Sequence, residues 1–332
     1  MITRRKALTT LAGMGAIGLS GCEQNISRPL YASDHHLSDY PTVKAVQAMS
    51  ELLAQKTNGR LSIKVYASGQ LGSERDTLEI TIFGGLDLNR VNAAPLNSIA
   101  PLTIVPCLPF LFENEAHLHL ALDGAPGQTV LDSLQDHGLV GLCYYDSGMR
   151  SFYNTKRPIR TPDDMRGMKF RVQNSDVYVS MINALGADAT PMYLGEVYQS
   201  LVQGVIDGAE NNWPSYQAGR HFEVAQYYSL TRHVMAPEIL VMSLHRWRSL
   251  SDADQTAVMQ SAKESVAIMR KLWAERVTRA RNDVINSGVE VNEVDDISEF
   301  SSLMKPLWER KSTLPKQKDL IEEILDMREA HT

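Results

Sequence analysis

The first hundred residues switch between two hydrophobic periods. From Thr42, which we take as an N-cap, apolar side chains recur at helical spacing through VKAVQAMSELLAQKT, and Gly59 closes the segment. LSIKVYA (61–67) then alternates as a strand does, and QLGSERDTLEITIFGG indicates a turn into a helix that ends at Gly84-Gly85. LDLNRV follows as a short strand. Helices alternating with strands in this way predict an α/β layered domain.

The middle of the chain repeats this rhythm. GLVGLCYYDSGMR (138–150) contains an apolar strand, TPDDMRG (161–167) has the capping residues of a helix start, and MKFRV (168–172) is a strand. SDVYVSMINALGA and GEVYQSLVQG have helical spacing, and VIDGAE (205–210) is a strand. NNWPSYQAGRH begins the next short helix, and EILVMS (238–243) is another strand. The pattern therefore predicts a second α/β unit.

One helix is unusually long. Ser251, with Asp254 three residues later, opens a segment that reaches Gly288 without glycine or proline. A compact lobe does not need such a length, whereas a strut crossing two lobes does. The 332 residues are also enough for two lobes of common domain size.

The N-terminus has the features of an export signal. MITRRKALTTLAGMGAIGLSGC combines a basic start with a short apolar run, Leu8 to Leu19, and ends in LSGC, which matches the bacterial lipobox. The paired arginines also resemble a twin-arginine signal. We predict a lipoprotein-type signal peptide over 1–22, lipid on Cys22, a tether over 23–30 and a periplasmic, membrane-anchored protein. An ordinary secretory peptide with an incidental cysteine is the alternative.

Charge and cysteine content exclude several classes of protein. Removing the three basic residues of 1–22 takes the formal net charge from −6 to −9, which argues against nucleic-acid binding. No later segment is long and apolar enough to span a membrane. Cys107 and Cys143 could form a disulfide in an oxidising compartment, but two buried thiols are the favoured reading. Cys/His clusters with metal-ligand spacing are missing from the sequence, so we predict no metal and no cofactor.

Several polar groups recur at the ends of the middle strands: Arg150, Arg171 and Asn211, with Glu210 beside it. In open α/β sheets, ligands bind outside the carboxyl ends of the strands. Two guanidinium groups suit a carboxylate, and an amide can orient the same ligand without adding charge. Salt bridges at the surface or between lobes are the structural alternative. As a set, these residues favour a ligand site.

At this point the chain resembles a known family. YNTKRPIRTPDDMRGMKFRV and GADATPMYLGEVYQSLVQGVIDGAENNWPSY are similar to the solute-binding proteins of tripartite ATP-independent periplasmic (TRAP) transporters, as are QLGSERD (70–76), LPFLF (108–112) and the long helix after EILVMS. The resemblance covers nearly the whole mature chain. It implies that Arg171 anchors a carboxylate, with Arg150 and Asn211 as the matching second arginine and amide.

The resemblance also implies a fold: an α/β, two-lobed periplasmic-binding-protein (Venus flytrap) fold with a long helix spanning both lobes. We place lobe I at 31–147 and 237–275, and lobe II at 148–236 and 276–332. The implied partners are a small sugar acid and the small and large TRAP membrane subunits. We predict a monomer that is not an enzyme.

The ligand class rests on two shorter segments. GAENNWPSY and HHLSDYP (35–41) are similar to family members that take hexuronic acids such as glucuronate or galacturonate. Glu74, Glu210, Asn212 and His36 would then serve ligand hydroxyls, and Trp213 would lie against the C–H face of the sugar. Each has an alternative: Glu74 can cap a helix, Trp213 can belong to the lobe core, and His36 can be an ordinary surface residue.

Three other functions remain open from the sequence. A C4-dicarboxylate is the second choice of ligand, but it would need cationic partners at both ends, and the sequence shows no third clustered arginine. A periplasmic enzyme would use Glu74, Glu210 and the histidines, yet the nucleophile elbow, metal spacing and phosphate loop of common enzymes are missing. A scaffold lipoprotein would need an exposed apolar patch in place of a polar cleft.

Overall fold

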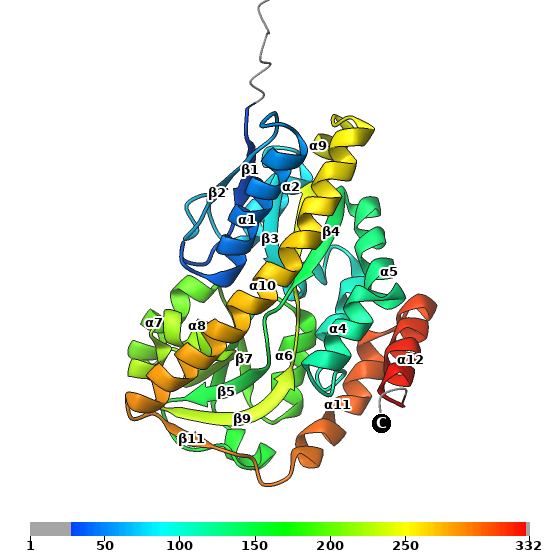
Figure 1. Cartoon of the computed structure of the whole chain (residues 1–332). Helices are drawn as coiled ribbons and strands as arrows, with labels where there is room; N and C mark the ends of the chain where they lie inside the picture. Colours follow the sequence, from blue (N-terminus) through cyan, green and yellow to red (C-terminus); the bar gives the residue numbers. More distant parts are fainter. Residues whose placement is uncertain (1–27, 330–332) are drawn as a thin grey trace, which may run out of the picture.

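A computed structural model describes residues 28–329 as two α/β lobes joined by a long helix (Figure 1). The signal peptide, Cys22 and most of the predicted tether lie outside the described residues. The first sheet has the strand order β2-β1-β3-β10-β4, in which β10 is antiparallel to both neighbours. Its strands are β1 (Leu30–Ser33), β2 (Ile63–Tyr66), β3 (Leu88–Asn92), β4 (Leu139–Tyr145) and β10 (Glu238–Ser243).

The second sheet has the order β11-β9-β5-β8-β6-β7. Its strands are β5 (Arg150–Asn154), β6 (Lys169–Val172), β7 (Asp188–Pro191), β8 (Gly208–Asn211), β9 (Tyr227–Val234) and β11 (Glu290–Asn292). The strands β6, β7 and β8 run parallel, and β5 is antiparallel to β8 and β9. The chain crosses between the sheets after β4, again after β9, where β10 returns to the first sheet, and a third time between β10 and β11.

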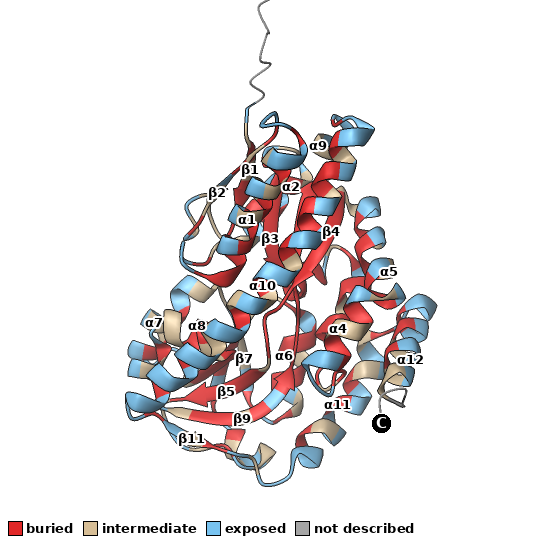
Figure 2. Ribbon diagram, in the orientation of Figure 1, coloured by how far each residue is buried: buried red, intermediate tan, exposed pale blue. Residues whose placement is uncertain are grey.

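Helices cover both sheets, and their outward faces are exposed while the central strands are buried (Figure 2). The edge strands β2, β7 and β11 are less buried. Four short 3-10 helices complete the architecture: η1 (Pro101–Cys107), η2 (Leu134–His137), η3 (Pro162–Met165) and η4 (His221–Glu223). The α-helices are α1 (Pro41–Lys56), α2 (Glu74–Ile82), α3 (Ala93–Leu96), α4 (Glu115–Asp123), α5 (Ala125–Ser133), α6 (Asp176–Ala184), α7 (Leu194–Val202), α8 (Trp213–Ala218), α9 (Leu244–Arg248), α10 (Asp252–Asn286), α11 (Ile297–Lys311) and α12 (Pro315–Glu329).

The long helix α10 confirms the predicted strut. It has 35 residues, begins after the N-cap Ser251, whose side chain accepts from the Asp254 N–H, and ends before Gly288. Figure 1 shows it running diagonally across both lobes, and it packs against α1 and β4 on one side and α8 on the other. Its buried residues are mostly small or apolar, and they include Trp273 at the level of the first crossing.

The predicted lobe boundaries at 147 and 237 fall inside the first two of the three crossings between the sheets, and they remain a prediction. The two last helices pack against different lobes. We placed 276–332 in lobe II, and α11 does pack on α6 and β9 of that side. In contrast, α12 packs on η1, α4 and α5, which precede β4.

The start of α1 differs from what the sequence led us to expect, and the state of the two cysteines, which the sequence left open, is settled. Helix α1 begins at Pro41 with Tyr40 as N-cap, so Thr42 is not the cap. The Thr42 hydroxyl instead donates to Asp34 Oδ2 at 2.6 Å. Cys107 and Cys143 are both free and buried, so the disulfide alternative is wrong. Burial raises the pKa of each thiol to about 12, which makes them inert apolar side chains.

Candidate ligand-binding site

A cavity of about 470 Å³ lies between the two lobes, a volume typical of small-molecule sites. It forms where strand ends from both sheets meet. Asn211 ends β8, and Arg150 begins the antiparallel β5, so both lie at the same edge of the second sheet. In the first sheet, Glu238 begins β10, which is antiparallel to β3, and it lies opposite Asn92 at the end of β3. The predicted residues that line the cavity are Arg150, Arg171, Asn211, Glu74 and His36.

Arg171, on β6, lines the cavity although it is only 3% exposed. Its Nε donates to the Met192 carbonyl at 2.9 Å. Within residues 28–329, its terminal nitrogens Nη1 and Nη2 have no hydrogen-bond partner. Burial lowers the pKa of Arg171, and the negative charge of Glu210 only partly opposes this. A buried cation whose fork faces a cavity is a site for an anion, and for a carboxylate in particular.

Arg150 also faces the cavity, but its charge is already compensated. Its Nη2 donates to Glu210 Oε1 at 2.7 Å, its Nε donates to the other carboxylate oxygen, and its Nη1 donates to Asn211 Oδ1 at 2.9 Å. Burial alone would raise the pKa of Glu210, but Arg150 and His233 lower it to about 2. Arg150 is therefore a neutralised donor beside Arg171 and supplies no second free positive charge.

Asn211 contributes through its amide nitrogen. Its Oδ1 accepts from Arg150 Nη1 and from the Asn212 backbone N–H at 2.9 Å. With the oxygen occupied, the NH₂ group is the part of the side chain that remains to donate to a ligand.

The other predicted residues of GAENNWPSY do not line the cavity. Glu210 is fully buried against Arg150. Asn212 caps α8 by accepting from the Ser215 N–H at 2.8 Å. Trp213 stacks on Tyr228 with ring centroids 4.0 Å apart, and it packs against a hydrophobic cluster of the second lobe. Glu210, Asn212 and Trp213 thus make structural contacts in place of lining the cavity, and their ligand roles stay predictions.

The first lobe contributes a cluster that sequence reasoning missed. Arg90 on β3 is 1% exposed and is surrounded by three carboxylates. Its Nη1 lies 2.6 Å from Glu238 Oε2 and 3.1 Å from Glu74 Oε1, and its Nη2 donates to Asp34. We call Asp34, Glu74, Arg90 and Glu238 the anionic cluster. In the sequence, its signal was the arginine within the predicted strand LDLNRV.

Glu74 is held firmly in this cluster. It accepts from the Asn92 N–H at 2.9 Å in addition to its contact with Arg90. Burial would raise the pKa of Glu74, but His35, Arg90 and the Asn92 N–H lower it to about 2. The helix cap that we considered for Glu74 is provided by Ser73 and Asp76 instead. Glu74 thus stays an ionised acceptor at the cavity wall.

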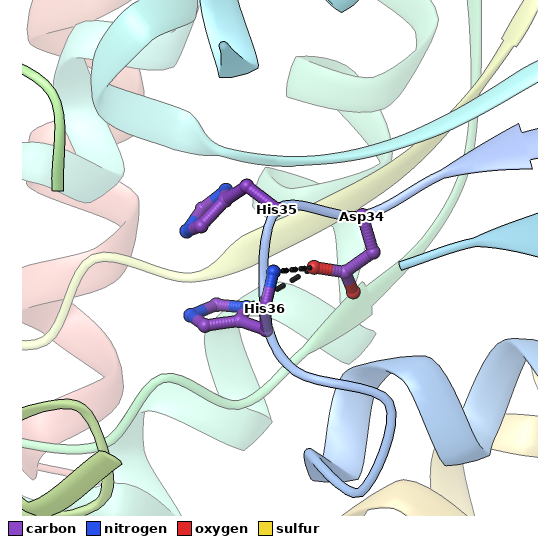
Figure 3. Close-up of side chains that lie close together, drawn as sticks. All are labelled: Asp34, His35 and His36. Carbon is purple, nitrogen blue, oxygen red and sulfur yellow. Dashed lines mark hydrogen bonds and ion pairs between the residues drawn. The ribbon is translucent and has the colours of Figure 1, made fainter. Parts of the chain in front are cut away.

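Two histidines complete this wall (Figure 3). His36 follows β1, and its backbone N–H donates to Asp34 Oδ1 at 2.9 Å, while its ring stacks on Tyr40 at 3.8 Å between centroids. Burial, His35 and Arg90 lower the pKa of His36 to about 4, so the imidazole is neutral near pH 7. Because Arg90 donates to Nδ1 at 2.9 Å, we assign the proton to Nε2.

The grouping of Asp34, His35 and His36 has the spacing of a metal site, with the ligand atoms within 4.8 Å of one another. However, Nη2 of Arg90 lies 3.0 Å from His35 Nδ1 and 2.9 Å from His36 Nδ1, and it also bonds to Asp34. A guanidinium already fills the centre of this group, and these residues do not fit an additional cation.

Buried hydrogen bonds join the lobes beside the cavity, and two of them connect side chains on different helices or loops of the two lobes. The Tyr40 hydroxyl, before α1, lies 2.9 Å from Ser215 Oγ on α8. The Ser175 hydroxyl, the N-cap of α6, donates to Asn97 Oδ1 at 2.7 Å. Both pairs link residues far apart in the sequence, and both are shielded from water.

Comparison with known proteins identifies the family. The model of the bacterial extracellular solute-binding proteins, family 7, matches residues 32–313. The chain belongs to this family. A solute-binding protein from Chromohalobacter salexigens is 42% identical over 292 residues, covering 88% of this chain and 87% of the relative. Members of the family bind solutes outside the cytoplasm and are not classed as enzymes.

Solved structures confirm the two-lobed fold and the resemblance to TRAP solute-binding proteins. One from Xanthobacter autotrophicus Py2, with bound β-D-galacturonate, is 48% identical with a TM-score of 0.87, covering 89% of this chain and 98% of that one. One from Chromohalobacter salexigens, with bound D-glucuronate, is 41% identical with a TM-score of 0.87, covering 90% and 99%. A search of residues 28–329 found no helix long and apolar enough to cross a membrane.

Proposed function

We propose that this solute-binding protein captures a hexuronate, such as D-galacturonate or D-glucuronate, by its carboxylate. The observation that carries the proposal is the fork of Arg171, buried and without a hydrogen-bond partner in residues 28–329, in a cavity of monosaccharide size. Around it, Glu74, Glu238, His36 and the Asn211 amide offer acceptors and donors for ring hydroxyls. The bound hexuronates of similar proteins support the same ligand class.

The C4-dicarboxylate alternative is weaker. Arg90 is the third clustered arginine that the sequence did not reveal; it contacts Glu74 and Glu238 of the cavity wall but does not itself line the cavity. Its charge is also exceeded by Asp34, Glu74 and Glu238. The first-lobe arginine that does line the cavity is Arg75, so a second carboxylate at that end would meet an exposed guanidinium that is already paired with Glu79.

Calorimetry with D-galacturonate, D-glucuronate, succinate and the neutral hexose D-galactose tests the proposal. We expect saturable binding of at least one uronate and binding of galactose at least about tenfold weaker, because a neutral sugar leaves Arg171 unpaired. Tight binding of succinate or galactose, with no binding of either uronate, would show that the proposed ligand class is wrong.

We further propose that the protein acts as a monomer, anchored by lipid at Cys22, and delivers its ligand to the TRAP membrane subunits. The motivation is LSGC at the end of the N-terminal apolar run. Replacing Cys22 with alanine should move the protein from the membrane fraction to the soluble fraction of host cells. Equal soluble fractions for both forms would exclude the anchor.

A further inference from the structure

The two ends of the cavity carry opposite net charge. In the second lobe, Glu210 compensates Arg150, and Arg171 is left as a surplus positive charge. In the first lobe, one guanidinium faces the three carboxylates of the anionic cluster, and His36 is neutral. That end carries a surplus of about two negative charges, and two of its carboxylates, on Glu74 and Glu238, line the cavity.

This polarity is built into the protein, because the groups that create it are buried. The Arg90 side chain is fully buried, and the side chains of Glu74 and Glu238 are only 12% and 6% exposed. Water therefore screens them weakly, and their charges act on whatever occupies the cavity. Arg171, buried in the opposite wall with its terminal nitrogens available, fixes which end of a ligand carries the negative charge.

We propose that Glu74 and Glu238 make the site selective for ligands with a single carboxylate, by excluding a second carboxylate from the end opposite Arg171. This inference rests on the proposed function and deepens it. Sugar hydroxyls can donate to both glutamates, so a uronate satisfies the cluster. An aldarate carries a carboxylate at each end of the carbon chain. Its second carboxylate would lie against the buried negative charges of Glu74 and Glu238.

Matched ligands test this without any change to the protein. Galactarate and its monomethyl ester share one open carbon chain and differ by one negative charge. At pH 8, where ordinary imidazoles are neutral, we expect the monoester to bind at least about tenfold more tightly than galactarate in calorimetry. If galactarate binds within about threefold of the monoester, or more tightly, the inference is wrong.

Variants locate the effect. Glu74→Gln keeps an oxygen that can accept from the Asn92 N–H, and it removes one charge; Glu74→Gln with Glu238→Gln removes two. Each step should raise the affinity for galactarate relative to galacturonate, by about tenfold or more in total. Glu51→Gln is the control, because Glu51 is an exposed residue of α1 that does not line the cavity. It should leave the ratio unchanged.

The outcomes separate this inference from the proposed function. If the unsubstituted protein binds no uronate, the proposed function is wrong. The inference is then decided by the affinity for galactarate alone. A higher affinity in the glutamine variants supports it, and an unchanged affinity overturns it. A ratio that is unchanged in the double variant also overturns it. Thermal unfolding of each variant checks that the fold is retained. If a variant does not fold, the comparison of galactarate with its monomethyl ester on the unsubstituted protein decides whether the inference holds.

Discussion

Replacing Arg171 with alanine should weaken hexuronate binding by a factor of about 30 to several thousand. Arg171 is the buried cation whose fork faces the cavity, and Arg150 cannot replace it because Glu210 already compensates its charge. Removing one partner from a desolvated charge pair costs roughly 2–5 kcal/mol. Calorimetry with galacturonate and glucuronate measures the loss. The Arg171→Lys variant should recover only part of the affinity, since an ammonium keeps the charge but loses the planar fork.

A second arginine at the mouth of the cavity provides the control. Arg75 lines the cavity, but it is exposed and pairs with Glu79 on the same helix. Arg75→Ala should change affinity by less than about threefold, because an exposed ion pair contributes little. If Arg171→Ala bound a uronate within the same threefold, the carboxylate would have to be held elsewhere, and Arg150 would be the next candidate.

Replacing Glu210 with alanine should lower the free energy of unfolding by about 3–5 kcal/mol, because it leaves the buried Arg150 without its carboxylate. Urea unfolding followed by circular dichroism measures this. Glu293→Ala is the matched control: Glu293 makes two hydrogen bonds of 2.9 Å to Arg232, but in an exposed position. We expect that control to change stability by less than about 1 kcal/mol.

The same variant decides between two roles for Glu210. As a structural partner of Arg150, it should affect stability and uronate affinity together, since a displaced Arg150 also disturbs Asn211. As a direct acceptor of ligand hydroxyls, it would affect affinity while stability stayed within about 1 kcal/mol of the unsubstituted protein. The latter result would contradict the structural role and restore the expectation from sequence.

The sequence was sufficient for the features that depend on local pattern. The strut was visible because a segment of that length without glycine or proline is rare outside a long helix. Arg171 and Asn211 could be brought together because both stand near the carboxyl ends of strands, where ligands bind in α/β sheets. The same premise was wrong for Arg150, which begins β5 and reaches that end of the sheet because β5 is antiparallel to β8. These arguments need no knowledge of distant contacts, and the structure places all three residues at the cavity.

The features that were missed depend on partners far apart in the chain. Arg90 lies 148 residues from Glu238, so its neutralisation by three carboxylates has no local signature. Glu210 stands beside Asn211, but its partner is 60 residues away, and the sequence cannot say whether a glutamate near an arginine meets ligand or guanidinium. The direction of Trp213 was equally open, because it depends on Tyr228 of β9.

The hydrogen bonds between Tyr40 and Ser215 and between Ser175 and Asn97 bear on how long a solute stays bound. The lobes cannot separate until both break, whereas a solute that meets open lobes is not hindered by them. They should therefore lengthen the residence time without slowing association, which stopped-flow release from a Tyr40→Phe variant would reveal as a faster dissociation rate. In the proposed delivery to the TRAP membrane subunits, the partner would have to supply contacts that compensate for these two bonds, so unloading would be a step that the partner controls.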